Sequence, residues 1–329
     1  MSNRNVLVTG GAGYVGSHIC KILKDKGYTP VVFDNLSTGH KEFVKWGPLY
    51  VGDILSLSDL DSAFLKFSIS SVIHCAAKAY VSESVSDPIK YYRENITGSI
   101  NVLDTFVRHG GIYFVFSSSC AVYGNTTNIR IKEDHQTTPI NPYGFTKLAI
   151  EKLIRDLKNI YKFNFAILRY FNAAGAEPQS GLGEWHEPET HIIPLMMNSL
   201  KTQNVFKIFG HDYSTYDGTA IRDFVHVSDL ALAHINSLEF LSSSKQDILC
   251  NIGSGDEISV LDLVLQMQKL DSKFQYVFEN RRVGDPEYLV ANNELSKIIL
   301  KMEYTNSSIS YILKTAQQWS KNISLNLND

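Results

Sequence analysis

A glycine-rich turn between an apolar strand and a helix constrains this chain more than any other feature. Val6–Thr9 is apolar and β-branched, and Gly10, Gly13 and Gly16 follow at three-residue spacing, just before a helix-period segment. Gly10 can take a left-handed turn, Gly13 lets the backbone approach a phosphate, and Gly16 allows close helix–strand packing. A helix N-terminus also favours a pyrophosphate. The turn therefore predicts a dinucleotide-binding Rossmann unit.

The rest of the first half alternates strand-like and helix-like segments. The expected strands are Val6–Thr9, Val31–Asp34, Leu49–Gly52, Ser71–Cys75, Ile112–Ser118 and Phe165–Tyr170. The expected helices are Gly16–Lys26, Ser58–Phe67, Ile89–His109 and Asn141–Tyr161. Such alternation, joined by right-handed crossovers, predicts an α/β fold with a doubly wound parallel sheet.

The pattern changes near residue 175, where a segment rich in Gly, Pro and Glu begins. Shorter elements follow, with strands expected near 206–209 and 248–252 and helices near 228–241, 260–270 and 307–319. We therefore expect a Rossmann domain over 1–175 and a smaller α/β substrate lobe over 176–329, with some crossing of the chain between them. A cleft between two lobes is a common place for a small-molecule site.

Composition excludes several other classes of function. The formal net charge is −3, so no strong field attracts nucleic acid or an anionic membrane. Apolar runs are strand-sized, and the chain enters a strand at once without a signal-peptide pattern, which favours a cytoplasmic location. The four cysteines form no metal-ligand spacing, so the sequence predicts small buried thiols and no metal site.

Two acidic residues complete the expected cofactor site. Asp34 ends the second strand, where a carboxylate accepts hydrogen bonds from the adenosine ribose hydroxyls and repels a 2′-phosphate. Asp34 therefore favours NAD over NADP. Asp53 follows a short strand, and the glycine spacing resembles that of the extended short-chain dehydrogenase/reductases, in which a carboxylate at this position contacts the adenine amine; a turn-forming role explains Asp53 about as well.

The segment 141–147 contains a tyrosine and a lysine on one helical face, Tyr143 and Lys147. A free tyrosine, with a pKa of about 10, is a poor base at neutral pH, and a nearby cation stabilises its phenolate. Lys147 is one such cation and an oxidised nicotinamide ring is a second. Ser119, at the end of an upstream strand, is the expected hydroxyl that shares a proton with Tyr143 and a substrate.

With these residues placed, the sequence resembles the UDP-glucose 4-epimerases of the extended short-chain dehydrogenase/reductase family over nearly its whole length. In the first half the matching motifs are VTGGAGYVGSH at 8–18, DNLSTG at 34–39, GD at 52–53, VIHCAA at 72–77, FSSSCAVYG at 116–124, NPYGFTK at 141–147 and LRYFNAAGA at 168–176. In the second half they are PETHIIP at 188–194, IFGHDYSTYDGTAIRDFVHVSDLA at 208–231 and RRVGDPEYL at 281–289. The second set is the more discriminating, because many reductases share the first.

The resemblance implies a catalytic set of Ser119, Tyr143 and Lys147. Together with the reasoning above, it places NAD against Gly10, Gly13, Tyr14, Val15, Gly16, Asp34, Asn35, Asp53, Ile54, Cys75, Ala76, Ala77, Lys78, Asn95, Tyr143 and Lys147. It places a UDP-sugar against Ser119, Tyr143, Asn172, His191, Ile192, Phe209, Arg222, Arg282 and Leu289. Arginine suits the diphosphate because its planar fork matches phosphate oxygens, although an ion pair of Arg222 with Asp223 or Asp229 is the structural alternative.

The chain departs from the family pattern at three positions. Lys78 lies one residue earlier than the lysine that usually reaches the cofactor pyrophosphate, and His191 stands where asparagine is frequent. Leu289 aligns with a position that holds tyrosine in some members, and a slip of one residue would assign Tyr288 there instead.

By resemblance, the expected reaction interconverts UDP-glucose and UDP-galactose through a transient 4-keto sugar, with NAD bound tightly and a homodimer formed by the helices at 89–109 and 141–161. Leu289 leaves room for a UDP-N-acetylhexosamine as an alternative substrate, and UDP-pentoses stay open. A non-catalytic NAD sensor is disfavoured because Tyr143 and Lys147 are present. A 4,6-dehydratase is disfavoured because Cys120 and Ala121 replace its acidic pair.

Overall fold

A seven-stranded parallel sheet forms the centre of the protein, seen here in a computed structural model that describes residues 4–126, 129–282 and 285–326. The strand order is β11-β6-β5-β4-β1-β2-β3, and the predicted α/β fold is confirmed. The strands are β1 (Asn5–Thr9), β2 (Thr29–Asp34), β3 (Leu49–Val51), β4 (Ser71–His74), β5 (Tyr113–Ser119), β6 (Asn164–Tyr170) and β11 (Ile248–Ile252). The order reverses beside β1, so the carboxyl ends of β1 and β4 flank the crevice in which open α/β sheets bind ligands.

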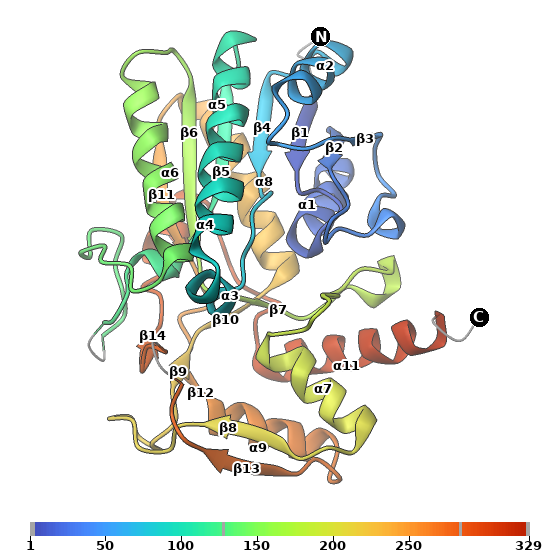
Figure 1. The fold of residues 1–329 in the computed structure, drawn as a ribbon, viewed down its shortest axis with the longest axis vertical. Helices are drawn as coiled ribbons and strands as arrows, with labels where there is room; N and C mark the ends of the chain where they lie inside the picture. The colour runs from blue at the N-terminus through green and yellow to red at the C-terminus, as the bar shows by residue number, and fades with distance from the viewer. Residues whose placement is uncertain (1–3, 127–128, 283–284, 327–329) are drawn as a thin grey trace.

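Helices cover both faces of this sheet (Figure 1). One face is packed by α1 (Tyr14–Asp25) and α8 (Val227–Ser244), whose apolar side chains meet those of β1 and β6. The other is packed by α2 (Leu57–Phe67), α5 (Gly98–Arg108) and α6 (Pro142–Lys158). The two apolar layers explain why the strands read as continuous hydrophobic runs instead of alternating patterns.

The expected long helix at 89–109 is interrupted by a π-helical segment. α4 (Pro88–Tyr91) runs into a π-helix, η2 (Tyr92–Thr97), which continues into α5. Single π turns are frequent at functional sites because they reorient one side chain. The residue in question here is Asn95, which is fully buried and hydrogen-bonds to the loop after β4.

The remaining elements build a smaller lobe below the sheet (Figure 1). Its helices are α7 (Ile192–Thr202), α9 (Val260–Leu270) and α11 (Ile309–Asn326), and they pack on a common apolar core with β8 (Phe206–Phe209). Its other strands are β9 (Ile221–Arg222), β12 (Ile258–Ser259), β13 (Tyr276–Glu279) and β14 (Tyr288–Leu289), while β10 (Phe224–His226) pairs with β7 (Asn172–Ala174). Short elements are η1 (Lys41–Phe43), α3 (Val81–Ser86), η3 (Cys120–Val122), η4 (Pro178–Ser180) and α10 (Glu294–Ile299).

After contributing to the smaller lobe, the chain returns to the seven-stranded sheet. β11 pairs in parallel with β6, with Ile248 opposite Ala166, and α8 packs against α1. Segments on both sides of residue 175 therefore contribute to the large sheet, and the division into 1–175 and 176–329 stays a prediction about domains.

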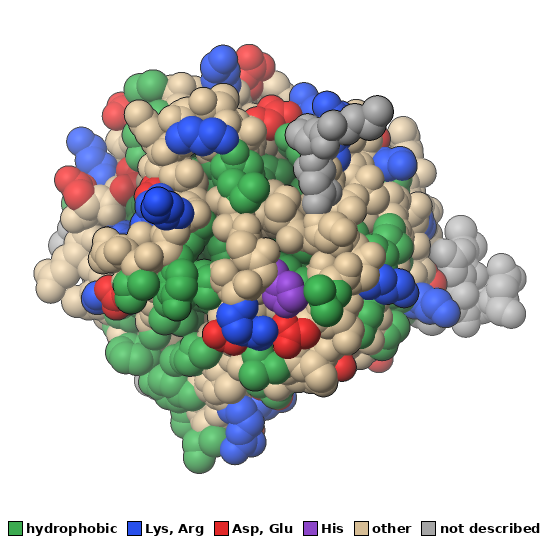
Figure 2. Space-filling view, turned by 90° about the horizontal axis from the view of Figure 1, so that it is seen from above, with side chains coloured by type: hydrophobic (Ala, Val, Ile, Leu, Met, Phe, Trp, Pro, Cys, Tyr) green, Lys and Arg blue, Asp and Glu red, His purple; other side chains and the backbone are tan. Residues whose placement is uncertain are grey.

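The surface carries mixed charges. Seen from above the sheet, Lys, Arg, Asp and Glu side chains are interspersed, and apolar side chains gather on the left flank, the side on which α5 and α6 stand in Figure 1 (Figure 2). None of the helices in the described part of the chain combines the length and apolar character that a bilayer crossing needs.

Candidate active site

A cavity of about 830 Å³ opens between the carboxyl edge of the sheet and the smaller lobe. Its upper wall holds the glycine turn, the loop after β4 and the end of β5, and its lower wall holds residues from α7, β9, β14 and the loop before β14. The cavity is therefore large enough for extended ligands and lies at the crevice that the strand order predicts.

The glycine turn has the close packing that a dinucleotide cradle requires. A Cβ on Gly16 would lie 2.1 Å from the Gly10 carbonyl oxygen, and Gly10 has a φ of +70° with Ala76 N only 2.8 Å from an added Cβ. Gly13 is the N-cap of α1 and supplies no side-chain cap, so the first amides of this twelve-residue helix are left for a ligand. The cavity wall here matches the shape and charge of a pyrophosphate.

Asp34 is held by the backbone at the end of β2. Its two carboxylate oxygens accept hydrogen bonds from Ala12 N at 3.0 Å and Leu36 N at 2.8 Å, and the side chain lines the cavity. Burial raises the pKa of Asp34, and these two amides oppose the shift. Because the carboxylate is fixed at the cavity wall, it is positioned to accept from ribose hydroxyls.

Asn95 supports the loop after β4 from behind. Its Oδ1 accepts from Lys78 N at 2.8 Å, and its Nδ2 donates to Lys78 O at 3.0 Å. The Lys78 side chain lines the cavity and its Nζ donates to Ser37 Oγ at 3.4 Å. The lysine that falls one position early in the sequence is therefore at the cavity, and Asn95 positions its backbone.

Ser119 and Tyr143 meet at the upper wall of the cavity, and Lys147 lies just behind them. Ser119 ends β5 and hydrogen-bonds to Tyr143 in the first turn of α6. Lys147 is one turn further along α6 and only 2 % exposed, with its Nζ 2.8 Å from Ser117 O and 5.8 Å from the centre of the Tyr143 ring. Asn141 begins α6 by accepting from Gly144 N, and this cap fixes where the helix presents Tyr143.

Burial is the main cause of the pKa shifts of Tyr143 and Lys147. It raises the pKa of Tyr143 to about 12, with the Ser119 hydrogen bond opposing, and lowers the pKa of Lys147 to about 8, with Cys75 and Glu151 opposing. One cation at 5.8 Å, in an effective dielectric of about 20, stabilises the phenolate by about 3 kcal/mol, or roughly two pKa units. Lys147 alone therefore leaves Tyr143 a weak base, and a second cation is needed.

The lower wall presents two arginines. Arg222 in β9 pairs with Asp285 at 2.5 Å, and the guanidinium carbon of Arg282 lies 3.8 Å from the centre of the Phe209 ring. The alternative partners for Arg222 are wrong: Asp223 accepts from Ser254, Gly255 and Ala291, and Asp229 accepts from Asn306 and Ser307. Both arginines line the cavity, and among the described residues Asp285 is the one carboxylate that pairs with Arg222.

Asn172 and Leu289 complete this wall. Asn172 donates from Nδ2 to Asp223 O at 2.8 Å. Leu289 lines the cavity, whereas Tyr288 is buried beside Ile221 and Val290. The structure therefore places Leu289, and not Tyr288, at the wall of the cavity.

Most of the predicted site residues line this one cavity. They are Gly10, Gly13, Tyr14, Val15, Gly16, Asp34, Asn35, Ile54, Cys75, Ala76, Ala77, Lys78, Ser119, Tyr143, Asn172, His191, Ile192, Arg222, Arg282 and Leu289. Four others are close behind it: Asn95 and Lys147 are buried, Phe209 lies under Arg282, and Asp53 accepts from Asn35 Nδ2 at 2.9 Å.

Several cavity residues were not predicted from the sequence, among them Tyr80, Glu184 and His186. Tyr80 stacks edge-on against the rings of His186 and His191. Glu184 and His186 lie within four residues of the PETH segment at 188–191, so their closeness in sequence to His191 is the signal that could have found them.

Comparison with known proteins places the chain in a family. It matches the NAD dependent epimerase/dehydratase family over residues 6–253. It is 44 % identical over 322 residues to a UDP-glucose 4-epimerase of Rhizobium meliloti, covering 97 % of this chain and 98 % of the relative. It is 43 % identical to a UDP-glucose 4-epimerase from Brucella ovis solved in complex with NAD, with a TM-score of 0.92 over 95 % of this chain and 97 % of that one.

A UDP-glucose 4-epimerase from Stenotrophomonas maltophila, solved with NAD and formylated UDP-arabinopyranose, is 32 % identical, with a TM-score of 0.94 over 98 % of this chain and 99 % of that one. The glycine turn, the fixed Asp34 and the Ser119–Tyr143–Lys147 group of this chain fit the cofactor that these structures contain. The chain belongs to the NAD dependent epimerase/dehydratase family.

Proposed function

We propose that this protein is an NAD-dependent 4-epimerase that interconverts UDP-glucose and UDP-galactose. One observation carries the proposal: Ser119 and Tyr143 share a single cavity with the glycine turn and with both arginines of the smaller lobe. A hexose bound by its diphosphate at the arginines would therefore meet the acid–base group beside the cofactor. Near full-length similarity to UDP-glucose 4-epimerases supports the choice of substrate.

Proton transfer falls to Tyr143. Its phenolate Oη takes the proton of the C4 hydroxyl, directly or through Ser119 Oγ, and bound NAD would supply reversible hydride transfer at C4. The Tyr143 phenol then gives the proton back to the C4 oxygen. Lys147 Nζ is positioned to stabilise the phenolate and to bind the nicotinamide ribose hydroxyls.

Inversion requires that the flat 4-keto sugar presents its other face between these two steps. Arg222 and Arg282 would hold the diphosphate, Phe209 would pack against the uracil, and Asn172, His191, Ile192 and Leu289 would border the sugar diphosphate. Firm contacts to UDP and few to the hexose allow the ring to swing about its link to the nucleotide. The cofactor would contact the glycine turn, Asp34, Asn35, Asp53, Ile54, the loop Cys75–Lys78 and Asn95.

A coupled assay of UDP-galactose conversion without added NAD tests the proposal. We expect turnover by the purified protein and a kcat/KM for UDP-galactose well above that for UDP-N-acetylgalactosamine. The reverse preference would assign the protein to the N-acetylhexosamine alternative, and no conversion of either sugar would refute an epimerase.

We also propose a homodimer in the cytoplasm. The flank made by α4, η2 and α6 exposes large apolar side chains, including Ile89 at 67 %, Phe145 at 49 % and Tyr92 at 39 %. An apolar cluster on adjacent helices is typical of a subunit interface. Light scattering should give twice the chain mass for the native protein and the single chain mass for Phe145→Glu, and a monomeric native protein would contradict the dimer.

A further inference from the structure

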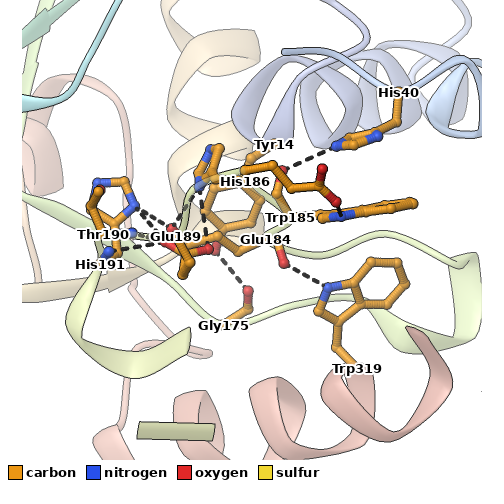
Figure 3. Close-up of polar contacts among 11 residues, drawn as sticks. Tyr14, His40, Gly175, Glu184, Trp185, His186, Glu189, Thr190, His191 and Trp319 are labelled. Atoms are coloured by element: carbon orange, nitrogen blue, oxygen red, sulfur yellow. Dashed lines mark hydrogen bonds and ion pairs between the residues drawn. The ribbon is translucent and has the colours of Figure 1, made fainter. Parts of the chain in front are cut away.

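Four metal-ligating side chains converge beside the cavity, in the loop that leads into α7. They are Glu184, His186, Glu189 and His191, and Figure 3 shows their polar ends pointing toward one another. One ligand atom from each residue lies within 4.8 Å of every other. The proposed epimerase chemistry does not require such a cluster.

Several distances between these atoms are close to those around a tetrahedral ion. His186 Nδ1 is 3.5 Å from a Glu184 carboxylate oxygen and 3.6 Å from a Glu189 oxygen, and His191 Nδ1 is 3.8 Å from the other Glu189 oxygen. Zinc bonds of about 2.1 Å in a tetrahedron separate neighbouring ligand atoms by about 3.4 Å. Only His191 Nδ1 and Glu184, at 2.5 Å, form a direct hydrogen bond that an ion would have to open.

The cluster also lacks a partner that an ion would supply. His186 Nδ1 is buried and makes no hydrogen bond, because its nearest carboxylate oxygens, from Glu184 and Glu189, lie at 3.5 and 3.6 Å. The Glu184 and Glu189 side chains are only 5 % and 18 % exposed, and among the described residues no lysine or arginine lies within 4.0 Å of either carboxylate. Two carboxylates withdrawn from water need compensating charge, and a divalent cation neutralises both.

We propose that Glu184, His186, Glu189 and His191 bind one divalent transition-metal ion, and that zinc suits this set best. Two imidazole nitrogens and two carboxylate oxygens are ordinary zinc ligands, and four protein ligands are typical of a structural site. The ion would connect the loop at 184–191 to the start of α7 at Ile192, and Ile192 lines the cavity. An imidazole that binds a metal through Nδ1 keeps Nε2 for another contact, so His191 can serve the ion and the cavity together.

The test uses untagged protein with its cofactor, purified without chelator and analysed by elemental mass spectrometry. We expect about one zinc per chain. Chelator-treated protein should take up zinc again in a calorimetric titration, with a rise in melting temperature. His186→Asn and Glu189→Gln should weaken zinc binding at least tenfold and abolish that rise. His211→Gln, which changes an exposed histidine outside the cluster, should behave as the native protein.

Two results would overturn the proposal. One is the absence of stoichiometric zinc in the native protein together with no zinc-dependent change in melting temperature, which would leave the histidines as proton-sharing partners of the glutamates. The other is zinc binding that persists unchanged in Glu189→Gln and His186→Asn, which would assign the ion to another group such as a cysteine. Circular dichroism confirms that each variant is folded, and the nearly isosteric Glu189→Gln carries the test if His186→Asn does not fold.

Discussion

The two walls of the cavity differ in how deeply their functional side chains are buried and in what holds them. On the sheet side the working groups are buried and held by backbone: Asn95 is 0 % and Lys147 2 % exposed, and both oxygens of Asp34 accept main-chain amides. On the lobe side the charged groups are held by other side chains and differ in exposure: His191 is 48 % exposed, and Arg222, which is 13 % exposed, pairs with the exposed Asp285. The first wall suits a ligand that stays through many turnovers, and the second suits one that is exchanged in each.

Among the variants that test this difference between the walls, Tyr143→Phe should have the largest effect on activity. Removing the hydroxyl removes the proton-transfer group while the ring still fills its buried site, so kcat should fall by about 10³-fold or more. The bound NAD content should stay that of the native protein, because the sheet-side wall is intact. Absorbance of the purified variant and the UDP-galactose assay measure both quantities, and native turnover by the variant would remove Tyr143 from the chemistry.

Gly16→Ala changes the sheet-side wall directly. The new Cβ would lie 2.1 Å from the Gly10 carbonyl oxygen, so the glycine turn must shift, at a cost of about 1–3 kcal/mol in stability. We expect bound NAD to drop by more than tenfold. Gly110→Ala is the matched control, because Gly110 has a φ of +70° but no atom within 4 Å of an added Cβ and lies at the end of α5. Equal loss of NAD in both variants would show that the effect is general destabilisation.

Arg282→Ala probes the lobe side. Losing a charged contact to the diphosphate should cost about 1.5 kcal/mol, or roughly tenfold in KM, with little change in kcat or NAD content. Arg281→Ala is the control, since Arg281 pairs with Asp212, and neither residue lines the cavity. A fall in kcat without a change in KM for Arg282→Ala would contradict its role as a nucleotide-binding residue.

The smallest effect concerns Lys147 in the NAD-free protein. Its pKa is lowered by burial to about 8, below the unfolded value of 10.5, so the folded state binds fewer protons between these values. Stability should therefore rise with pH from about 8 to 10.5, and below about 8 the contribution of Lys147 should be at its lowest and independent of pH. Lys147→Met should remove this pH-dependent change in stability. We expect that change to be about 1 to 3 °C in melting temperature between pH 7.5 and 9.5. If melting temperature varied with pH in the same way in the native protein and in Lys147→Met, the lowered pKa of Lys147 would be disproved.

The sheet-side wall could be predicted from sequence because its residues follow local rules. A glycine turn after a strand, an acidic residue at the next strand end and a tyrosine–lysine pair on one helix are each set by chain geometry. The lobe side depends on contacts between distant segments. The pairing of Arg222 with Asp285 spans 63 residues, and β11 joins the large sheet through its pairing with β6, so neither had a local signal. The π segment at Asn95 was also missed, since its residues have ordinary helical periodicity.

The glutamate–histidine cluster escaped prediction for another reason. The predicted absence of a metal site rests on the spacing of the cysteines, whereas this cluster consists of carboxylates and imidazoles within one loop. Only the folded loop shows that four such groups face a common centre (Figure 3).

The central claim is that one retained cofactor is oxidant and reductant within a single turnover. The direct test is to incubate the purified protein, without added NAD, with UDP-galactose carrying deuterium at C4 and to analyse the UDP-glucose product by mass spectrometry and NMR. We predict that deuterium stays at C4 of the product, with no exchange with solvent or with external NADH. Loss of the label to water, or conversion only when NAD is supplied, would contradict the account.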